Sequence, residues 1–365
     1  MARALELAKA QEARTSPNPW VGAVIVHDGE VVGEGATEPP GGRHAEVVAL
    51  DAAGERARGA EIYVTLEPCS FQGRTAPCAE ALVRAGVRQM HYAMTDPDPR
   101  VSGRGATMLR EAGIEVEEGG DLAEAAQALL EPYSHQRRTG RPLVTAKFAV
   151  SLDGKIAATS GDSRWVSSEE SRSAAHEMRA RVDAILVGSE TVVVDNPSLT
   201  ARPGGRLSDH QPLRVVLDGR GRVSPTAEVF KGPGRALVIT SQASAERWRS
   251  DTKKVADLEM AAAGENGGLS PQAVLRSLND RGVLHLLLEG GGQVHGSFFD
   301  AGLVDRVYAV IAPMIIGGPG AGAVVGRGAA RMADAWRLER LQVSRLGPDI
   351  LVQGIPRRAG RPEVE

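Results

Sequence analysis

The chain has 365 residues, of which 42% are hydrophobic and 24% are charged. This length predicts two domains rather than a single core, and the composition is that of an ordinary globular protein. The net charge of -3 gives no general case for nucleic-acid binding. No apolar run reaches the roughly 18 residues of a membrane span, and the N-terminus lacks the apolar core of a targeting peptide. We therefore expect a cytoplasmic protein with neither nucleic acid nor membrane as a partner.

The first third of the chain alternates between predicted strands and helices, which predicts a sheet with helices on both faces. The predicted helices cover residues 1–14, 44–57, 77–86, 106–113 and 121–133. The predicted strands cover residues 20–27, 30–35, 61–68, 87–94 and 114–119, and Asp28-Gly29 turns the first two into a hairpin. In the loop 15–19, two prolines fix the backbone around Asn18, whose amide either contacts a substrate or only forms a turn.

A candidate metal site lies between His44 and Cys78. His44, Cys69 and Cys78 supply one imidazole and two thiolates, a ligand set that suits zinc and leaves a fourth position for water. Cys69 and Cys78 are the only cysteines, and Cys78 falls near the start of a predicted helix, where a thiolate is favoured. Glu46 follows His44 by two residues, as the proton-transferring glutamate does in zinc nucleobase deaminases. The alternative is a stray histidine and two buried thiols.

Residues 134–142 are polar, end in a proline and are interpreted as the domain boundary. Beyond them, near-continuous apolar runs predict a largely parallel central sheet. The predicted strands cover residues 143–151, 183–189, 213–219, 235–240, 283–290, 306–318, 338–346 and 350–355. A helix is predicted at 167–182 with Ser167 or Ser168 as its N-cap, and the irregular segment 151–165 is a candidate binding region. Residues 253–270 carry little signal.

A glycine-rich segment, Glu289-Gly290-Gly291-Gly292-Gln293-Val294-His295-Gly296, follows the predicted strand 283–290. Glycines between a strand and a helix let backbone N–H groups approach a phosphate, although many such turns bind nothing. Arg179 and Arg202 are suitable forks for a phosphate, but an arginine on a helix is more often a solvated surface charge. Trp165 either stacks on a planar ring or covers the core.

The segments PNPWVGAVIV, GGRHAEVVAL and LEPCSFQGRTAPC resemble the deaminase half of the bifunctional riboflavin-biosynthesis deaminase/reductase family. The resemblance implies that His44, Cys69 and Cys78 hold zinc and that Glu46 shuttles protons. Three positions depart from the family pattern, which has histidine in place of Thr37 and Phe71 and asparagine in place of Asp98. We expect Asp98 to place a negative charge near a substrate phosphate, unless neighbours such as Arg43 and Arg74 compensate for it.

The segments TAKFAVSLDGKIAATSGDSRWVSSEESR, MRARVDAILVGSETVVVDNPSLTAR, QPLRVVLD and LLLEGGG resemble the reductase half of the same family. The resemblance implies NADPH as the cofactor, and a set of residues that contact it: Ala149, Trp165, Thr191, Asp195, Gly290, Gly291, Gly292, Gln293, Val294, His295 and Gly296. It likewise implies substrate contacts from Ser163, Arg179, Leu199, Arg202 and Glu289, to which the residues themselves add Asn18 in the first domain. Lys147 and Asp153 fall in the same region and are weaker candidates.

We therefore predict an α/β protein with a cytidine-deaminase-like domain at 1–138, a dihydrofolate-reductase-like domain at 139–357 and a loose tail at 358–365. The predicted activities are zinc-dependent deamination of a phosphorylated diaminopyrimidinone and NADPH-dependent reduction of its ribosyl group, in a homo-oligomer. Two alternatives stay open. Either the altered pocket gives the deaminase a different or weak activity beside a true reductase, or the zinc is only structural, an idea that Glu46 argues against.

Overall fold

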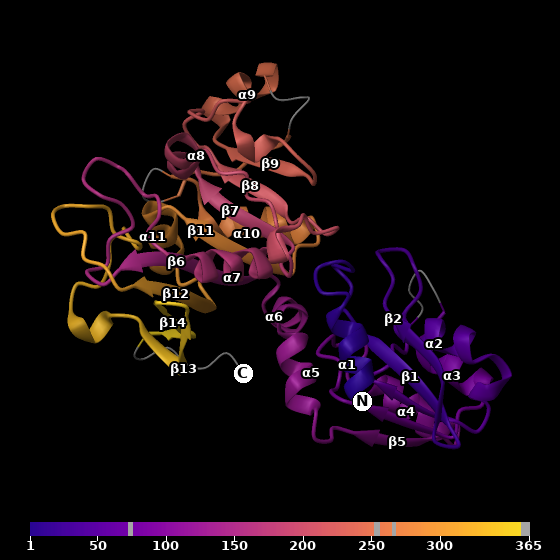
Figure 1. Cartoon of the computed structure of the whole chain (residues 1–365). Coiled ribbons are helices and arrows are strands. Elements are labelled where there is room, and N and C mark those ends of the chain that lie inside the picture. The colour runs from indigo at the N-terminus through magenta and orange to yellow at the C-terminus, as the bar shows by residue number, and fades with distance from the viewer. Residues whose placement is uncertain (72–75, 252–255, 265–267, 359–365) are drawn as a thin grey trace. The chain divides into compact units, whose positions relative to one another are not determined.

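The computed structural model describes residues 1–71, 76–251, 256–264 and 268–358. It divides into two compact units, Met1–Arg141 and Pro142–Glu365, which are described separately (Figure 1). Within the described ranges, none of the helices has the length and apolar character that crossing a membrane requires. Of the predicted tail at 358–365, all but Arg358 lies outside the described residues.

The first unit is built on a five-stranded sheet in the order β2-β1-β3-β4-β5. Its strands are β1 Gly22–His27, β2 Glu30–Ala36, β3 Glu61–Val64, β4 Gln89–Tyr92 and β5 Glu115–Glu118. β1 is antiparallel to β2 and β3, while β3, β4 and β5 run parallel. Asp28 and Gly29 both adopt positive φ angles, 51° and 80°, as a two-residue hairpin turn requires, so the predicted hairpin is confirmed.

Helices cover both faces of this sheet, as predicted. The helices and 3₁₀ turn are α1 Ala2–Lys9, α2 Ala45–Ala53, η1 Gly54–Ala57, α3 Cys78–Ala85, α4 Arg104–Glu111, α5 Ala123–Leu129 and α6 Glu131–Thr139. A Cβ on Gly22 would lie 2.0 Å from the Ala4 carbonyl oxygen of α1, and one on Gly35 would lie 2.2 Å from the Ala45 carbonyl oxygen of α2. Gly22 pairs with Ala36, the neighbour of Gly35, so the two glycines face opposite sides and α1 and α2 pack on opposite faces.

The polar segment 134–142, which we interpreted as the domain boundary, is helical over much of its length. Helix α6 runs from Glu131 to Thr139 and has a proline in its first turn, where the missing N–H costs no hydrogen bond. It ends at Gly140, whose φ of 70° is left-handed. Polar composition alone could not distinguish a linker from this solvated helix.

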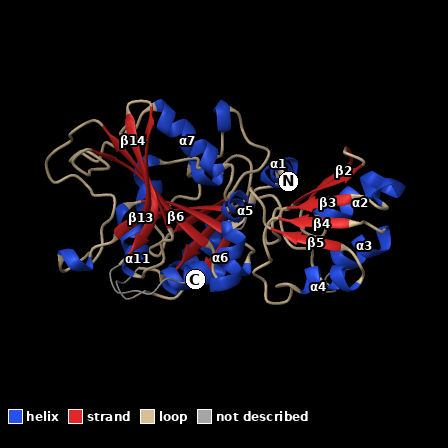
Figure 2. Cartoon of the chain, turned by 90° about the horizontal axis from the view of Figure 1, so that it is seen from below, coloured by secondary structure: helices blue, strands red, loops and turns tan. Residues whose placement is uncertain are grey.

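The second unit holds a nine-stranded sheet in the order β10-β9-β8-β7-β11-β6-β12-β14-β13 (Figure 2). Its strands are β6 Leu143–Ser151, β7 Ala184–Gly188, β8 Leu213–Leu217, β9 Ala236–Thr240, β10 Asp257–Met260, β11 His285–Gly290, β12 Arg306–Ala312, β13 Arg337–Leu346 and β14 Asp349–Arg357. β14 alone runs opposite to the other strands of this sheet, which confirms the largely parallel sheet. β10 falls in the segment that carried little sequence signal.

The helices of this unit are α7 Glu169–Arg179, α8 Ser189–Asp195, α9 Ala245–Asp251, α10 Pro271–Asp280 and α11 Gly292–Asp300. Shorter 3₁₀ turns cover Pro203–Gly205, Glu228–Phe230, Gln242–Ser244 and Met332–Asp334. Ser168 is the N-cap of α7 and accepts the Ser171 N–H at 3.3 Å, as one of the two predicted caps. Helix α8 directly follows β7.

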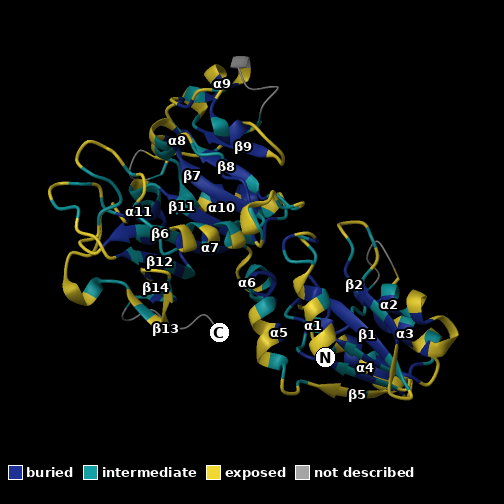
Figure 3. Cartoon of the chain, viewed as in Figure 1, coloured by how far each residue is buried: buried dark blue, intermediate teal, exposed yellow. Residues whose placement is uncertain are grey.

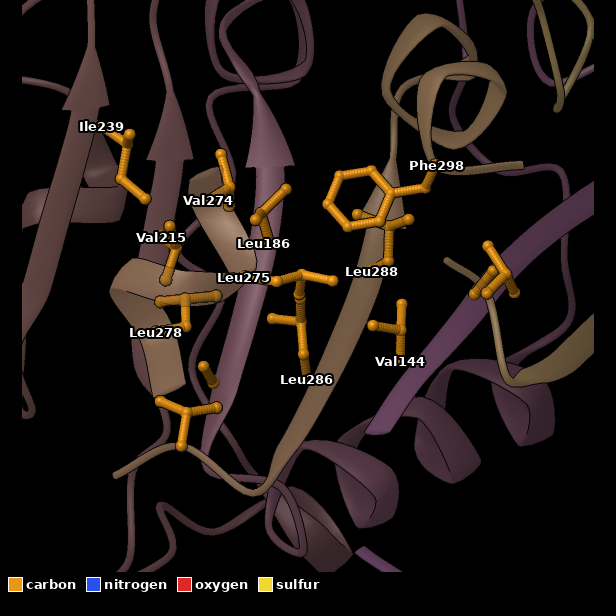
Figure 4. Close-up of a cluster of buried hydrophobic side chains, with 14 of the residues drawn as sticks. Val144, Leu186, Val215, Ile239, Val274, Leu275, Leu278, Leu286, Leu288 and Phe298 are labelled. Atoms are coloured by element: carbon orange, nitrogen blue, oxygen red, sulfur yellow. The ribbon is translucent and has the colours of Figure 1, made fainter. Parts of the chain in front are cut away.

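The central strands of this sheet are largely buried (Figure 3). Their alternate residues belong to two hydrophobic clusters, one on each face of the sheet. Leu186 and Leu286 belong to the cluster that also includes Leu278 of α10 and Phe298 of α11 (Figure 4). Their neighbours in sequence, such as Leu287, belong to the other cluster. Because both faces are buried, the strands read as continuous apolar runs.

Candidate functional sites

In the first unit, the three predicted metal ligands converge. The ligand atoms of His44, Cys69 and Cys78 all lie within 4.8 Å of one another, with His44 Nδ1 at 3.2 Å from Cys78 Sγ and 3.6 Å from Cys69 Sγ. A tetrahedral zinc with bonds of about 2.0–2.3 Å places its ligand atoms roughly 3.3–3.8 Å apart. The distance of 3.6 Å lies within this range and that of 3.2 Å lies just below it, so the donor set and its spacing are compatible with zinc.

Local structure explains how the ligands meet. His44 is the N-cap of α2 and Cys78 is the first residue of α3, so both side chains project from helix N-termini. Cys69 lies beyond β3, and its sulfur accepts the Cys78 backbone N–H at 3.3 Å. A hydrogen bond from the Cys78 side chain, the largest effect, lowers the pKa of Cys69 to about 4, and it raises the pKa of Cys78.

Glu46 stands beside these ligands in the first turn of α2 and is only 4% exposed. Burial, followed by the nearby Cys69 sulfur, raises its pKa to about 7. A carboxyl group with a pKa close to neutrality is equally able to accept and to return a proton. The structure therefore places a buried carboxyl group next to the ligand cluster.

A second buried carboxylate, which the sequence did not single out, shapes the surrounding loop. Glu67 accepts backbone N–H groups from Asp96, Gly103, Gly105 and Ala106 at 2.8–3.3 Å. It thereby ties the segment before Cys69 to the turn 95–103 and the start of α4. No local sequence pattern signals this role, because all four partners are distant backbone groups.

The three departures from the family pattern behave differently from what their chemistry suggested. Asp98 is 4% exposed and accepts Arg100 Nε at 2.9 Å and Nη2 at 2.6 Å, with Arg137 Nε at 3.4 Å. These guanidinium groups lower the pKa of Asp98 and neutralise its charge. This pairing supports the alternative that neighbouring residues compensate for the charge of Asp98.

The arginines that pair with Asp98 are not Arg43 and Arg74, which the sequence suggested. Arg43 is already paired with Glu38 and Asp51, at 2.6 and 2.8 Å, and Arg74 lies outside the described residues. Thr37 is buried and its hydroxyl oxygen accepts the Val21 N–H at 3.1 Å, which fixes the backbone beyond β2.

Phe71 lies 4.6 Å below the Arg100 guanidinium. Asn18 is half-buried in its turn, with its backbone N–H donating to Thr15 O at 2.9 Å. No side-chain partner of Asn18 occurs among the residues that the structure describes, and its role stays a prediction.

In the second unit, a cavity of about 1700 Å³ brings together most of the predicted reductase residues. Those that line it are Ala149, Ser163, Trp165, Arg179, Thr191, Asp195, Leu199, Arg202, Glu289, Gly290, Gly291, Gly292, Gln293, Val294 and His295, together with Lys147. Gly296 and Asp153 do not line it. Its size suits a dinucleotide together with a small substrate.

An ion pair between α7 and β11 lies in the lining of this cavity. Arg179 donates to both carboxylate oxygens of Glu289, at 2.7 and 2.6 Å, and their side chains are 15% and 8% exposed. Burial lowers the pKa of the nearby Lys147, while the negative charge of Glu289 opposes this shift. Arg179 is therefore a buried, paired cation and not a solvated surface arginine.

Arg202 sits at a second polar point, formed with α7. Its Nη1 donates to Thr200 Oγ1 at 3.0 Å, and its Nη2 lies 3.5 Å from His176 Nε2. Burial and the two neighbouring arginines lower the pKa of His176. His176 lines the cavity. The sequence did not indicate it, because it belongs to no motif and lies next to Arg179 only through the turn of helix α7.

At the end of α8, Asp195 is bound by two residues of the loop after β6. Ser163 Oγ donates to Asp195 Oδ1 at 2.6 Å, and Arg164 Nη2 donates to the Asp195 carbonyl oxygen. Trp165 is 66% exposed with Arg172 stacked 4.5 Å over its ring. An exposed indole at a cavity rim contributes nothing to the core, which excludes the alternative that it covers the core.

The glycines of the loop 290–296 serve different purposes. Gly290 has a φ of 110°, and a Cβ on Gly292 would lie 2.4 Å from the Gly322 carbonyl oxygen. A Cβ on Gly296 would lie 1.5 Å from the Val325 carbonyl oxygen, so this glycine is required for packing. Gly291 is the N-cap of α11, whose first turn presents backbone N–H groups without helical acceptors.

Two further predicted residues, His295 and Asp153, make hydrogen bonds within the fold. Both ring nitrogens of His295 lie 3.0 Å from backbone carbonyl oxygens, those of Ala323 and Leu288. The Asp153 carboxylate accepts hydrogen bonds from the N–H groups of Ile316 and Gly317, at 3.0 and 2.8 Å, and these bonds fix the turn after β6. These contacts leave neither residue an obvious polar atom for a ligand.

Comparison with known proteins matches both units. Residues 1–94 match the family model described as cytidine and deoxycytidylate deaminase zinc-binding region, and residues 142–352 match the RibD C-terminal domain. The chain is 42% identical over 358 residues to the riboflavin biosynthesis protein RibD of Bacillus amyloliquefaciens, covering 98% of this chain and 95% of that protein. It is 38% identical over 362 residues to RibD of Escherichia coli, covering 96% of each.

Solved structures agree over the whole chain. Acinetobacter baumannii RibD superposes with a TM-score of 0.83 and 36% identity, covering 98% of both chains. A diaminohydroxyphosphoribosylaminopyrimidine deaminase/5-amino-6-(5-phosphoribosylamino)uracil reductase from Thermotoga maritima gives a TM-score of 0.80 and 34% identity, covering 98% of this chain and 97% of that one.

Proposed function

The chain belongs to the RibD family of riboflavin-biosynthesis proteins, and from this membership we propose which of its own residues carry the two reactions. It is a bifunctional enzyme, with a cytidine-deaminase-like zinc unit and a dihydrofolate-reductase-like unit that uses NADPH. The observation that carries the deaminase assignment is the cluster of His44, Cys69 and Cys78 with the buried Glu46 beside it.

We propose that the first unit deaminates 2,5-diamino-6-(5-phosphoribosylamino)pyrimidin-4-one. His44, Cys69 and Cys78 would hold the zinc, which when bound supplies an activated water as nucleophile. Glu46 would take the proton of that water and return it to the departing amino group, for which its pKa of about 7 is suited. The buried position of Glu46 keeps bulk water from competing for this proton.

The second unit would then reduce the ribosyl group of 5-amino-6-(5-phosphoribosylamino)uracil to a ribityl chain, with NADPH supplying the hydride. Cofactor contacts would come from Ala149, Thr191, Asp195 and the first turn of α11. Arg202 would contact the substrate phosphate, while Arg179 holds Glu289 in place to contact sugar hydroxyls. These residues bind and orient, which is the main protein contribution to a hydride transfer.

The alternative of an altered or weak deaminase loses its main support, because Asp98 is neutralised by Arg100 and Arg137. Homo-oligomeric assembly and a cytoplasmic location are part of the proposal and rest on the sequence.

Product analysis tests the proposal directly. Zinc-loaded protein is incubated with the diaminopyrimidinone phosphate, with and without NADPH, and products are identified by mass. We expect the deaminated uracil without NADPH and the ribityl product with it. A protein that reduces supplied uracil intermediate but never deaminates would contradict the roles of the zinc cluster and Glu46.

A further inference from the structure

Glu67 completes the first turn of α4 from outside that helix. The N-cap of α4 is Gly103, which has no side chain to accept the N–H groups that begin the helix. The Glu67 carboxylate accepts them instead: its Oε2 binds the Gly103 N–H at 2.8 Å, and its Oε1 binds those of Gly105 and Ala106 at 3.0 and 3.2 Å. A carboxylate in this place also meets the positive end of the helix dipole. The residue that completes α4 therefore lies only two positions before the proposed zinc ligand Cys69.

The segment 67–69 is held between two helices. On one side, the Cys69 carbonyl oxygen accepts the Ala79 N–H of α3 at 3.2 Å. On the other side, the start of α4 packs on the Pro68 carbonyl oxygen so closely that a Cβ on Gly105 would lie 2.0 Å from it. Glu67 is only 3% exposed, and its carboxylate supplies the hydrogen bonds on this second side. The position of Cys69 is therefore fixed by α3 and α4 together.

We propose that Glu67 is a positioning residue for the deaminase zinc. By joining α4 to the segment 67–69, it holds Cys69 at the place where His44 and Cys78 can bind the same ion. A ligand that is already in place loses less conformational entropy when the metal binds, so the residues that support it raise the affinity for the metal. The proposal rests on the proposed zinc site and gives the two buried carboxylates different roles: Glu46 carries a proton, whereas Glu67 sets the zinc affinity through Cys69.

The zinc affinity of the full chain, measured by competition with a chromogenic chelator, tests this role. Glu67→Gln keeps the size of the side chain but turns an NH2 group toward two of the N–H donors. We expect zinc to bind about 10–100-fold more weakly, the usual cost of losing a residue that orients a metal ligand. Excess zinc should restore most of the deamination rate of this variant, whereas it should restore none of the rate that Glu46→Gln loses.

Leu109→Ala is the matched control. Leu109 is fully buried on α4, so this change opens a cavity beneath the same helix and lowers the thermal stability of the unit, but it leaves the hydrogen bonds of Glu67 in place. Its zinc affinity should stay close to that of wild type. Wild-type zinc affinity in folded Glu67→Gln, or an equal loss of affinity in Leu109→Ala, would overturn the proposal, because a merely structural residue would act only through stability.

Hydrogen exchange of the unaltered protein tests the same coupling without any variant. If the contacts of Glu67 favour zinc binding, then bound zinc must stabilise those contacts by the same free energy. The backbone amides of 103–111 should therefore exchange faster in zinc-free than in zinc-loaded wild type, while those of α5, Ala123–Leu129, exchange equally in both. Equal exchange at 103–111 in the two forms would contradict the proposal alone. A purified wild type that binds no zinc would contradict the proposed deaminase function as well.

Discussion

The two active sites of this chain are built in opposite ways. The deaminase site needs four side chains from a stretch of 35 residues, His44 to Cys78, and they form one compact cluster. The reductase site draws on residues from Lys147 to Gly326 around a cavity of about 1700 Å³. We therefore expect the deaminase site to lose activity when a single ligand or carboxylate atom is replaced. We expect the reductase site to lose activity when the residues that line its cavity are displaced.

We expect the largest effect from replacing Glu46, the proposed proton carrier of the deaminase site. Glu46→Gln should slow deamination by about 10²–10⁴-fold, the usual contribution of general acid–base catalysis. Reduction of supplied uracil intermediate should stay within error of wild type, since Glu46 belongs to the other unit. Rates of both reactions are measured on purified protein, with Glu80→Gln on the exposed face of α3 as the control.

Removing one ligand should empty the same site. Wild-type protein is expected to contain about one zinc per chain, and Cys78→Ser should lose most of it because a hydroxyl is a far poorer zinc ligand than a thiolate. Metal content is measured by atomic emission. Full zinc in the folded variant would refute the ligand set, whereas an unchanged reductase rate would sharpen the separation between the two sites.

A substitution in the ion pair of Arg179 and Glu289 tests the lining of the reductase cavity. Arg179→Gln leaves the Glu289 carboxylate buried without its bidentate partner, and breaking a buried pair in this way costs about 3–5 kcal/mol. We expect lower thermal stability of the second unit and loss of reduction, with deamination retained. Arg172→Gln, on the same helix but stacked on exposed Trp165, should have a much smaller effect.

The smallest effect is expected at Asp98. The Arg100 partner is 60% exposed, so Asp98→Asn should cost less than about 1 kcal/mol, and it should not raise the deamination rate. Because pairing lowers the folded-state pKa of Asp98, its contribution is present above the unfolded value and is lost as pH falls through the folded value. Acid unfolding curves of the two proteins should therefore converge at low pH. A clear gain in deamination would contradict the neutralised pair.

The contrast also explains how much the sequence could reveal. His44, Cys69 and Cys78 were predictable because zinc ligands are chemically distinctive and lie on adjacent elements. The parallel sheet followed from apolar runs such as β7 and β11, which are buried on both faces. Most of the reductase residues were predicted from the resemblance to the family.

What the sequence could not reveal depends on three-dimensional partners. Asp98 could be recognised as a charge, but its neutralisation required the positions of Arg100 and Arg137. Gly296 looked like part of a phosphate loop until its contact with the Val325 carbonyl showed a packing role. Glu67 and His176 carried no motif at all, and α6 was hidden by its polar composition.

The central claim, two separate sites in one chain, is tested most directly by mixing two inactivated variants. Glu46→Gln removes deamination, and Gly291→Asp places a negative side chain at the N-cap of α11, where a cofactor phosphate would approach. Each variant alone, given the diaminopyrimidinone phosphate and NADPH, should form no ribityl product by mass. The mixture should form it, because the intermediate released by one variant is reduced by the other. No ribityl product from the mixture, with both variants folded and each retaining its remaining activity, would contradict two sites that work independently.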